Sequence, residues 1–392
     1  MTFDLADGDY SSPLHIKTPL VYSKSLSDQS GQHIWLKLET EQPSGSFKSR
    51  GVGRSCWAAV QKHGPKSHLI AASGGNAGLA AAMASSRLGV KCTIFVHDKT
   101  EKAIIDKLES FGANVKRMDG GWDKVNAGAL KLAEEDPNGI YIHPFEGNDL
   151  VLGHSSIIQE IYDQLQLAEN NEVGEISMRR PDIISSAVGG GGLIRGLMYG
   201  CSEISRQTGT PPTHILGVTT LGADSWSLSL ENEDTFIEIP DPYSMAKSLA
   251  CKACSKDSVR DSRIYAKTGK LSFNPEPKPV NGSSIKSEHL TSVRIDDSYA
   301  GSAAWKLTEQ LDGGKTLIEL STGAAMIPVY QPAILDEIKS KSKILKDEEK
   351  LNVVIIVCGG YRVSQQDLNH YKEKFCEGYG KIYVDGIELK TN

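Results

Sequence analysis

The chain has 392 residues, of which 39% are apolar and 23% are charged, and its formal net charge is -6. A chain of this length is too long for one compact core, so we expect two domains, or one large domain that carries a smaller one. The acidic balance argues against a general nucleic-acid-binding protein, and no apolar run reaches the roughly 20 residues that span a bilayer.

Short apolar runs alternate with helical patterns along the first third of the chain. The expected strands are 34–38, 68–72, 92–96 and 114–118, and the expected helices are 76–88, 101–111 and 122–134. Gly89 and Gly112 follow two of these helices, at the position where glycine commonly ends a helix. The repeated strand–helix order predicts a parallel sheet with helices on its faces.

The same alternation resumes after Tyr141. The expected elements are a helix at 155–165, a strand at 183–188, a helix from Leu193, and strands at 215–218 and 353–357. The strands are almost purely apolar, which is typical of central strands covered on both faces. We therefore expect an α/β fold of two units, a small one at 43–145 and a large one formed by 1–42 and 146–392.

Residues 251–292 interrupt this order. The segment holds Pro275, Pro277 and Pro279 and has weak apolar periodicity. A long stretch without a regular pattern inside a compact chain is typical of a functional or mobile loop. We predict a surface insertion there.

Seven cysteines are scattered along the chain, and an odd number with such spacing does not indicate a disulfide framework. The acidic segment 1–10 lacks the apolar stretch of a signal peptide, so we expect a reducing, cytoplasmic location. Cys251 and Cys254 have the spacing of half a zinc site, but no second Cys or His pair follows nearby. We interpret them as loop thiols and predict no metal site.

Lys48 stands where a loop gives way to a helix, in the string Pro43-Ser44-Gly45-Ser46-Phe47-Lys48-Ser49-Arg50-Gly51. The helix N-terminus and Arg50 place positive charge nearby, which lowers the pKa of a lysine and favours the neutral amine. A neutral amine is the nucleophile that forms an imine with an aldehyde cofactor. A lone lysine is more often simply solvated, so the neighbouring motifs decide between the two interpretations.

Four consecutive glycines, Gly189, Gly190, Gly191 and Gly192, lie between an apolar strand and a helix. Without Cβ atoms, their N–H groups can approach a ligand closely, and the helix dipole favours an anion. No G-x-G-x-x-G register fits here, and no Gly-Lys-Ser/Thr follows, so neither a dinucleotide fingerprint nor a Walker A loop is present. The pattern predicts a phosphate-binding loop, with a flexible turn as the alternative.

Two further glycine-containing loops follow predicted strands. In Ser73-Gly74-Gly75-Asn76-Ala77-Gly78, the N–H groups and the Ser73 hydroxyl could hold a carboxylate, and the Asn76 amide could bond a phenolic oxygen. An N-cap without a ligand is the alternative for this loop. Cys358-Gly359-Gly360 follows the last core strand, and a buried cysteine there is ordinarily a small apolar residue.

In combination and in this order, these four motifs resemble the fold-type II pyridoxal phosphate (PLP) enzymes, and most closely the eukaryotic cytosolic L-serine/L-threonine dehydratases. The resemblance extends to Lys17-Thr18-Pro19-Leu20, His143-Pro144-Phe145, Gly153-His154 and Gly323-Ala324-Ala325. It covers nearly the whole chain except 251–292 and the last few dozen residues. It implies two parallel-sheet α/β domains of the tryptophan synthase β-like architecture and a homodimer.

The resemblance also implies a role for each matching residue. Lys48 would bind PLP as a Schiff base and then move the Cα proton of the substrate. The other expected cofactor contacts are Phe47 beside the ring, Asn76 at the 3-hydroxyl, Gly189, Gly190, Gly191 and Gly192 at the phosphate, and Cys358 at the pyridine nitrogen. Ser73, Gly74 and Ala77 would line the substrate-carboxylate loop of a mobile small domain. A thiol is a weak partner for the nitrogen, which suits β-elimination from serine to give pyruvate and ammonia.

Three positions depart from the family pattern. Thr219-Thr220 stand where the dehydratases usually have a Glu-Thr pair, and Glu319-Leu320-Ser321-Thr322-Gly323 stands for Glu-Pro-Ala-Cys-Gly. Both lie near the family's monovalent-cation site, so no metal is assigned. Tyr361-Arg362 replace the Ser or Asn that usually follows Cys358-Gly359-Gly360. These changes leave open β-replacement or β-elimination on another amino acid, and a PLP-binding sensor or partner protein with little turnover.

Overall fold

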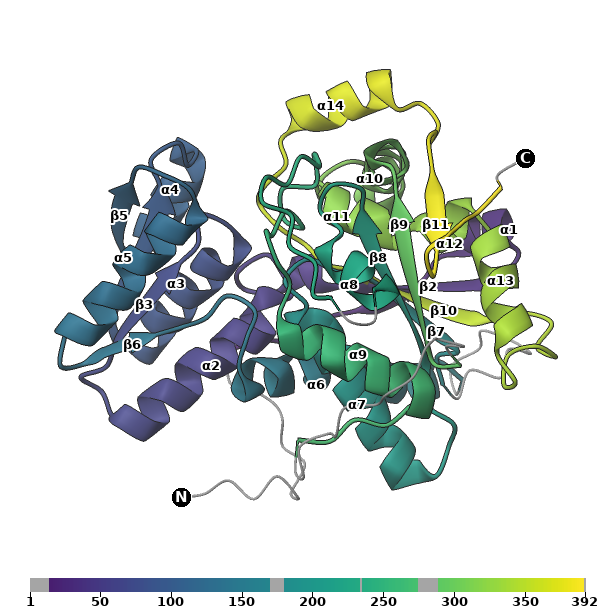
Figure 1. Cartoon of the computed structure of the whole chain (residues 1–392), viewed down its shortest axis with the longest axis horizontal. Helices are drawn as coiled ribbons and strands as arrows, with labels where there is room; N and C mark the ends of the chain where they lie inside the picture. Colours follow the sequence, from purple (N-terminus) through teal and green to yellow (C-terminus); the bar gives the residue numbers. More distant parts are fainter. Residues whose placement is uncertain (1–13, 170–179, 233–234, 274–287, 391–392) are drawn as a thin grey trace.

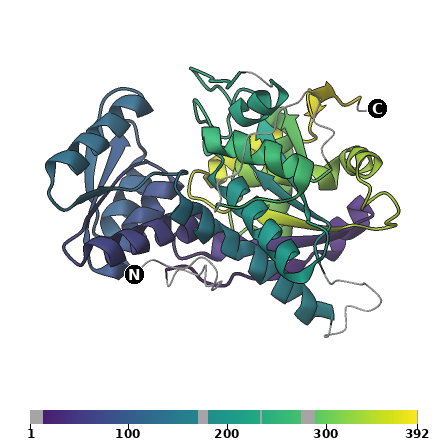
Figure 2. The same ribbon diagram turned by 60° about the horizontal axis from the view of Figure 1, so that its bottom comes forward.

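The structure, a computed structural model, describes residues 14–169, 180–232, 235–273 and 288–390. Its strands form two sheets, one in each of two units that lie side by side, with α2 (Lys48–His63) running between them (Figure 1). The two units are also distinct when the molecule is viewed from a second direction (Figure 2). Two α/β units are therefore present, which confirms the predicted fold class.

The small unit contains a four-stranded parallel sheet in the order β5-β4-β3-β6. Its elements are β3 (His68–Ala72), α3 (Asn76–Leu88), β4 (Lys91–His97), α4 (Lys102–Ser110), β5 (Asn114–Met118), α5 (Trp122–Glu135) and β6 (Gly139–Tyr141). Apolar side chains of α2, α3 and α4 form the core on one face of the sheet, and α5 packs on the other face. The inner strands β3 and β4 are thus covered on both faces, as their apolar sequences predict, whereas the edge strand β5 is largely exposed.

The large unit contains an eight-stranded sheet in the order β1-β2-β10-β7-β8-β9-β11-β12. Its strands are β1 (Leu20–Tyr22), β2 (His33–Leu38), β7 (Ile183–Ala187), β8 (His214–Thr220), β9 (Leu290–Ile295), β10 (Asn352–Val357), β11 (Ile382–Val384) and β12 (Ile387–Glu388). The five central strands are parallel, and only the edge strands β1, β11 and β12 pair antiparallel. Because parallel strands end at one edge, the residues after β7 and β10 meet there.

Helices surround the large sheet. They are α1 (Lys24–Ser30), α6 (Asn148–Glu169), α7 (Gly192–Thr208), α8 (Ser225–Glu231), α9 (Lys256–Thr268), α10 (Asp297–Asp312), α11 (Leu320–Ala325), α12 (Ile327–Tyr330), α13 (Ala333–Lys341) and α14 (Gln365–Lys374), with a short 3-10 turn, η2 (Glu39–Glu41). In the core, α6 packs against α7, α7 against α9, and α10 against α11. Among the described residues, no helix combines the length and the apolar character needed to cross a membrane.

The segment 251–292 differs from its prediction. Its described part contains α9, which buries Val259, Ile264 and Tyr265 against the large core. The expectation of a surface insertion is therefore wrong for this part, because a mostly polar sequence forms a helix with one buried face. The prolines Pro275, Pro277 and Pro279 lie outside the described residues.

Candidate active site

Lys48 is the first residue of α2, at the junction between the two units. The main-chain N–H of Phe47 donates to the carbonyl oxygen of Cys358 at 3.0 Å, which holds the start of α2 at the carboxyl end of β10. The Nζ of Lys48 donates to the carbonyl oxygen of Pro144 at 2.6 Å. Burial lowers the pKa of Lys48 to about 8, and the nearby Cys251 and Cys358 thiols oppose that shift. A substantial neutral fraction of the amine is thus present near neutral pH.

The cause of this shift differs from the sequence-based expectation, which invoked Arg50. The Arg50 guanidinium is fully buried and forms ion pairs with Glu39 and Glu160, each at 2.7 Å. Its charge is therefore balanced within the core of the molecule. Desolvation of Lys48, rather than a neighbouring cation, accounts for the lowered pKa.

Phe47 lies beside a buried histidine. Its ring centroid is 5.1 Å from that of His154, and the Nζ of Lys48 is 5.1 Å from the Phe47 ring centroid. Burial keeps the pKa of His154 well below its ordinary value, so the imidazole is neutral. Neither ring nitrogen of His154 has a hydrogen-bond partner within the described parts of the chain. The sequence reasoning noted His154 only as part of the resemblance.

The tetraglycine loop joins β7 to α7, as predicted. Gly191 has a φ of 90°, in the left-handed region that favours glycine, and a Cβ at Gly190 would clash with the Phe145 ring. No described residue accepts a hydrogen bond from the main-chain N–H groups of Gly190, Gly191 or Gly192. Free N–H donors at a helix N-terminus form a cradle for an anion such as phosphate.

Pro144 and Phe145 connect this loop to Lys48. Pro144 accepts the Lys48 hydrogen bond, and the next residue, Phe145, packs where side chains on Gly190 and Gly192 would otherwise lie. The amine and the glycine cradle are therefore neighbours across one short segment.

The second loop, 73–78, joins β3 to α3 in the small unit. A Cβ at Gly78 would clash with the Ser73 carbonyl oxygen, so the turn requires glycine. Ser73 and Gly74 are partly exposed, whereas Ala77 is buried in the small core, so Ala77 can meet a ligand only through its main chain. The predicted carboxylate contacts at this loop remain predictions.

Asn76 reaches across to the large unit. Its Nδ2 donates to Glu319 Oε1 at 3.3 Å, and its Oδ1 accepts from the main-chain N–H of Tyr361 at 3.2 Å. Glu319 Oε1 also accepts from the main-chain N–H of Arg362 at 2.8 Å, and Glu319 Oε2 accepts from the Ser248 hydroxyl. Glu319 and Ser248 belong to this network, and sequence reasoning gave neither a role in the site.

Cys358 follows β10 and is buried. Its thiol donates to the carbonyl oxygen of Ile356 at 3.5 Å. Burial raises the pKa of Cys358 to about 12, and the Glu319 carboxylate adds to this rise. The thiol is therefore neutral at physiological pH, which is the property expected of a weak partner for a pyridine nitrogen.

The Thr219 position does not supply a carboxylate. Its hydroxyl forms hydrogen bonds with Ser227 Oγ at 2.8 Å and with the carbonyl oxygen of Val293 at 3.4 Å. Within the described ranges, no group of three or more His, Cys, Asp or Glu side chains is placed to hold a metal ion. Cys251 lies near Lys48, since each influences the pKa of the other, and all seven cysteines are free.

The residues present fit PLP. They offer an amine of lowered pKa for its aldehyde, free N–H donors for its phosphate and a neutral thiol at the end of β10. Cys358 and the glycine cradle follow neighbouring strands of one sheet, and Lys48 is held beside Cys358. The cofactor roles of Phe47 and Asn76 remain predictions.

Comparisons with known proteins agree with this geometry. Residues 11–359 match the family model described as pyridoxal-phosphate dependent enzyme. The chain is 33% identical to an L-serine dehydratase of Dictyostelium discoideum over 92% of each chain. It is 32% identical to the human L-serine dehydratase/L-threonine deaminase, over 92% of this chain and 96% of the relative.

Solved structures give the same result. A fungal L-serine ammonia-lyase from Rhizomucor miehei superposes with a TM-score of 0.72 at 27% identity, over 92% of this chain and 99% of the other. The processed threonine deaminase isoform 2 of Solanum lycopersicum superposes with a TM-score of 0.69 at 23% identity, and so supports the fold alone. The chain belongs to the pyridoxal-phosphate-dependent enzymes, with the fold of the serine and threonine dehydratases.

Proposed function

We propose that this enzyme eliminates water and ammonia from L-serine, and from L-threonine, to give pyruvate or 2-oxobutanoate. The observation that carries the proposal is the partly buried amine of Lys48, with its pKa lowered to about 8, held at 2.6 Å from the Pro144 oxygen and beside a glycine cradle. The relatives named as serine dehydratases, about one-third identical over most of the chain, support the choice of substrate.

When bound, PLP supplies the electron withdrawal that acidifies the Cα–H bond of an amino acid. The chain supplies the base, because the neutral amine of Lys48 can accept the Cα proton. The Cα–Cβ double bond forms as the Cβ–O bond breaks, and the hydroxyl leaves as water after taking a proton. The enamine that is released then hydrolyses to the 2-oxo acid and ammonia.

The other residues position the reactants. The glycine cradle would hold the phosphate, and Ser73 and Gly74 would hold the substrate carboxylate through the start of α3. The neutral Cys358 thiol would place no strong charge at the ring nitrogen of a bound cofactor, which would favour reactions in which a leaving group departs from Cβ.

An amino-acid panel with product identification tests the proposal. Purified protein with PLP is mixed with L-serine, L-threonine and β-chloro-L-alanine, and ammonia and 2-oxo acids are measured. We expect equal amounts of ammonia and pyruvate from L-serine, and a loss of about 1,000-fold in kcat for Lys48→Ala. Lys62→Ala, an exposed lysine in the last turn of the same helix, is the matched control and should keep wild-type activity.

Two outcomes would overturn the proposal. Binding of serine without any turnover would indicate a sensor or partner protein. A product that forms only when a nucleophile is added would indicate β-replacement.

We further propose a homodimer in the cytoplasm, with 43–145 as a mobile substrate domain. The seven free cysteines support a reducing compartment. Light scattering of the purified protein tests the dimer, and a monomeric mass would contradict it.

A further inference from the structure

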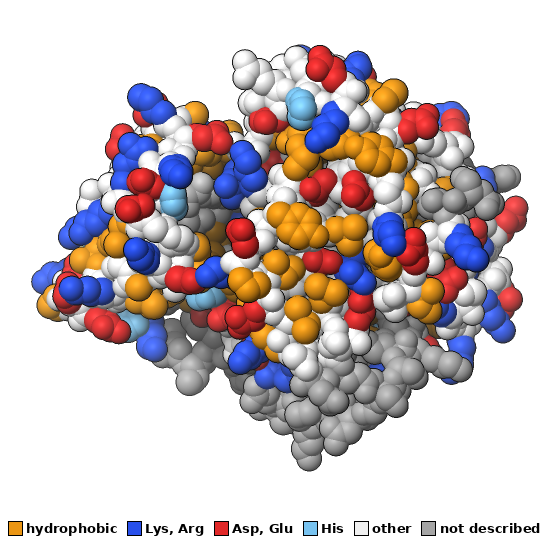
Figure 3. Space-filling model, turned by 45° about the horizontal axis from the view of Figure 1, so that its top comes forward, with side chains coloured by type: hydrophobic (Ala, Val, Ile, Leu, Met, Phe, Trp, Pro, Cys, Tyr) orange, Lys and Arg blue, Asp and Glu red, His pale blue; other side chains and the backbone are white. Residues whose placement is uncertain are grey.

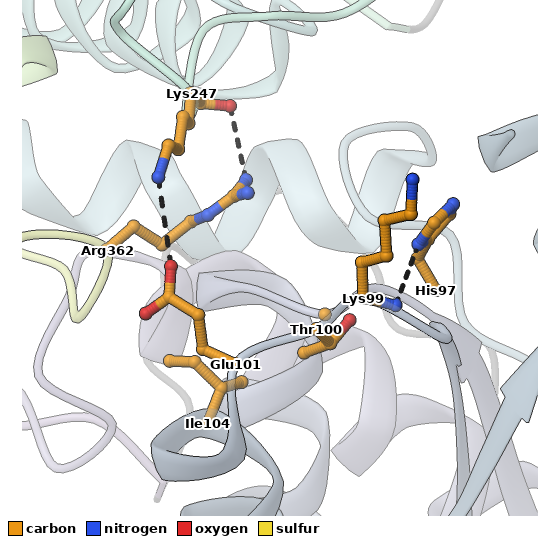
Figure 4. Close-up of a pocket in the computed structure, with 8 residues that line it drawn as sticks. His97, Lys99, Thr100, Glu101, Ile104, Lys247 and Arg362 are labelled. Carbon is orange, nitrogen blue, oxygen red and sulfur yellow. Dashed lines mark hydrogen bonds and ion pairs between the residues drawn. The ribbon is translucent and has the colours of Figure 1, made fainter.

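A cavity of about 260 Å³ lies between the two units, beside Gly74 of the 73–78 loop. Gly74, His97, Lys99, Thr100, Glu101 and Ile104 line it from the small unit, and Lys247 and Arg362 line it from the large unit (Figure 4). Figure 3 shows Lys and Arg side chains along the hollow between the units. Gly74 belongs to the loop expected to bind the substrate carboxylate, so the cavity adjoins the substrate position.

The cavity has an excess of positive charge. The residues that line it include three cations, Lys99, Lys247 and Arg362, and one carboxylate, Glu101. Glu101 is engaged by Lys247, whose Nζ lies 3.7 Å from its Oε1. The charges of Lys99 and Arg362 are left uncompensated by the residues that line the cavity.

Arg362 is held in place at both ends. Its main-chain N–H donates to Glu319 at 2.8 Å, and its Nη1 donates to the carbonyl oxygen of Lys247 at 3.2 Å. A Cβ at Gly75 would lie 3.2 Å from Arg362 Cδ, so the side chain passes directly over the start of α3. The remaining guanidinium donors are available to a ligand in the cavity.

Cys251 connects Arg362 to the catalytic lysine. Burial raises the pKa of the Cys251 thiol, and the positive charges of Lys48 and of Arg362 both oppose this rise. The cavity is joined to the 73–78 loop by hydrogen bonds, because the Arg362 main-chain N–H and Asn76 Nδ2 donate to the same oxygen, Glu319 Oε1.

We propose that this cavity is a subsite for a second anionic group of the substrate, with Arg362 as the residue that selects it. The enzyme would then act on β-substituted amino acids that carry a carboxylate or phosphate beyond Cβ, and bind them more tightly than serine. The inference rests on the proposed β-elimination. It adds a substrate class to that function and assigns a role to the arginine that departs from the dehydratase pattern.

The α-carboxylate is a less suitable partner for Arg362. The N–H groups at the start of α3 are the predicted anion site for the α-carboxylate. The Arg362 side chain covers Gly75 of that loop, and its Nη1 donates to the carbonyl oxygen of Lys247 on the opposite wall of the cavity. A guanidinium there suits a group at the end of a side chain, because it can bind a carboxylate or phosphate in bidentate fashion.

Binding of L-aspartate and L-asparagine to the PLP-loaded enzyme tests the proposal by calorimetry. The two ligands have the same shape, differ by one charge and lack a leaving group on Cβ. We expect aspartate to bind about tenfold more tightly than asparagine. In Arg362→Gln, the ratio of the two dissociation constants should fall to near one. Lys247→Gln should lower the ratio in the same direction. Lys102→Gln, a nearby exposed lysine paired with Asp106 and outside the cavity, should leave it unchanged.

Turnover distinguishes the two kinds of anion. With 3-hydroxyaspartate, Lys48 takes the Cα proton, water leaves from Cβ, and hydrolysis of the enamine gives oxaloacetate and ammonia. With O-phospho-L-serine, phosphate leaves in place of water, and pyruvate and ammonia follow. A kcat/KM above that for L-serine with either substrate supports the subsite and identifies its anion.

The possible failures are separable. Equal affinities for aspartate and asparagine in an enzyme that turns over L-serine would overturn the subsite and leave the proposed function standing. If Arg362→Gln loses affinity for aspartate and for asparagine to the same extent, Arg362 binds the α-carboxylate, and this result would also overturn the proposal. An enzyme that binds PLP but neither binds nor converts any amino acid would overturn the proposed function itself. The absorbance of the bound cofactor shows whether each variant is folded.

Discussion

The Nζ of Lys48 lies 2.6 Å from the carbonyl oxygen of Pro144, and this hydrogen bond fixes the amine beside the segment that packs on the glycine cradle. A carbonyl oxygen accepts a hydrogen bond but carries no charge that could balance that of an ammonium group. The partly buried amine therefore has a hydrogen-bond acceptor and no carboxylate among the influences on its pKa, which is lowered to about 8.

The lowered pKa predicts how cofactor binding depends on pH. Only the neutral amine attacks the aldehyde, so the rate of PLP incorporation into cofactor-free protein should rise about tenfold per pH unit below pH 8. Above that pH the rate should level off. Stopped-flow absorbance measures this profile, and a rate that keeps rising toward pH 10 would show that the lysine is an ordinary one.

Gly190→Ala tests the cradle. The added methyl group would clash with the Phe145 ring, so we expect a loss of about 1–3 kcal/mol in the free energy of unfolding. PLP affinity should fall at least about tenfold, because the loop must shift. Gly53→Ala is the control. Gly53 lies inside α2, and a Cβ there would meet the Leu14 side chain at an ordinary contact distance of 3.4 Å. A Gly→Ala change inside a helix favours stability. Denaturant unfolding with and without PLP gives both quantities. The same unfolding free energy and the same PLP affinity in the two variants would contradict the role of Gly190 in the cradle.

Glu319→Ala tests the network that spans the two units. The change removes the acceptor for Asn76 Nδ2 and for the Arg362 main-chain N–H, and buried donors without partners cost about 1–3 kcal/mol each. We expect a lower free energy of unfolding and weaker PLP binding, since Asn76 loses its orientation. The control Glu309→Ala removes an exposed ion pair with Lys372 and should change stability by less than about 1 kcal/mol.

Alkylation tests the environment of Cys358. Its pKa of about 12 leaves only about one thiolate in 10,000 at pH 8, and its side chain is buried. In native protein treated with iodoacetamide at pH 8, exposed Cys376 should react first and Cys358 should stay unmodified. All seven cysteines should react in denaturant. Rapid native labelling of Cys358, read by peptide mass spectrometry, would contradict a closed, neutral thiol.

Local patterns in the sequence predicted much of the small unit. Strands 68–72 and 114–118 and helix 76–88 have the same bounds in the structure as in the prediction. Strand 68–72 is mostly apolar and is followed by the Ser73-Gly74-Gly75 turn, and helix 76–88 is alanine-rich and ends at Gly89, so local sequence is sufficient for these two elements. Helix α9 was missed because it buries Asp261, which pairs with Arg195 at 2.8 Å, and a buried ion pair breaks the apolar pattern that marks a helix.

The predicted site residues are those that stand in local motifs, such as Lys48 and the four glycines. Glu319 could not be found in this way, because it meets Asn76 across 243 positions of sequence. Arg362 could be flagged only as a departure from a family pattern. Its place over Gly75 depends on how β10 and α3, from different units, come together.

The most direct test of the account is the chemical identification of the residue that binds PLP. The loaded protein is reduced with borohydride, digested and analysed by mass spectrometry, with Lys48→Ala alongside. We predict a pyridoxyl group on Lys48 and none in the variant. A pyridoxyl group on another lysine, or no modified peptide in protein that has bound PLP, would contradict the central claim.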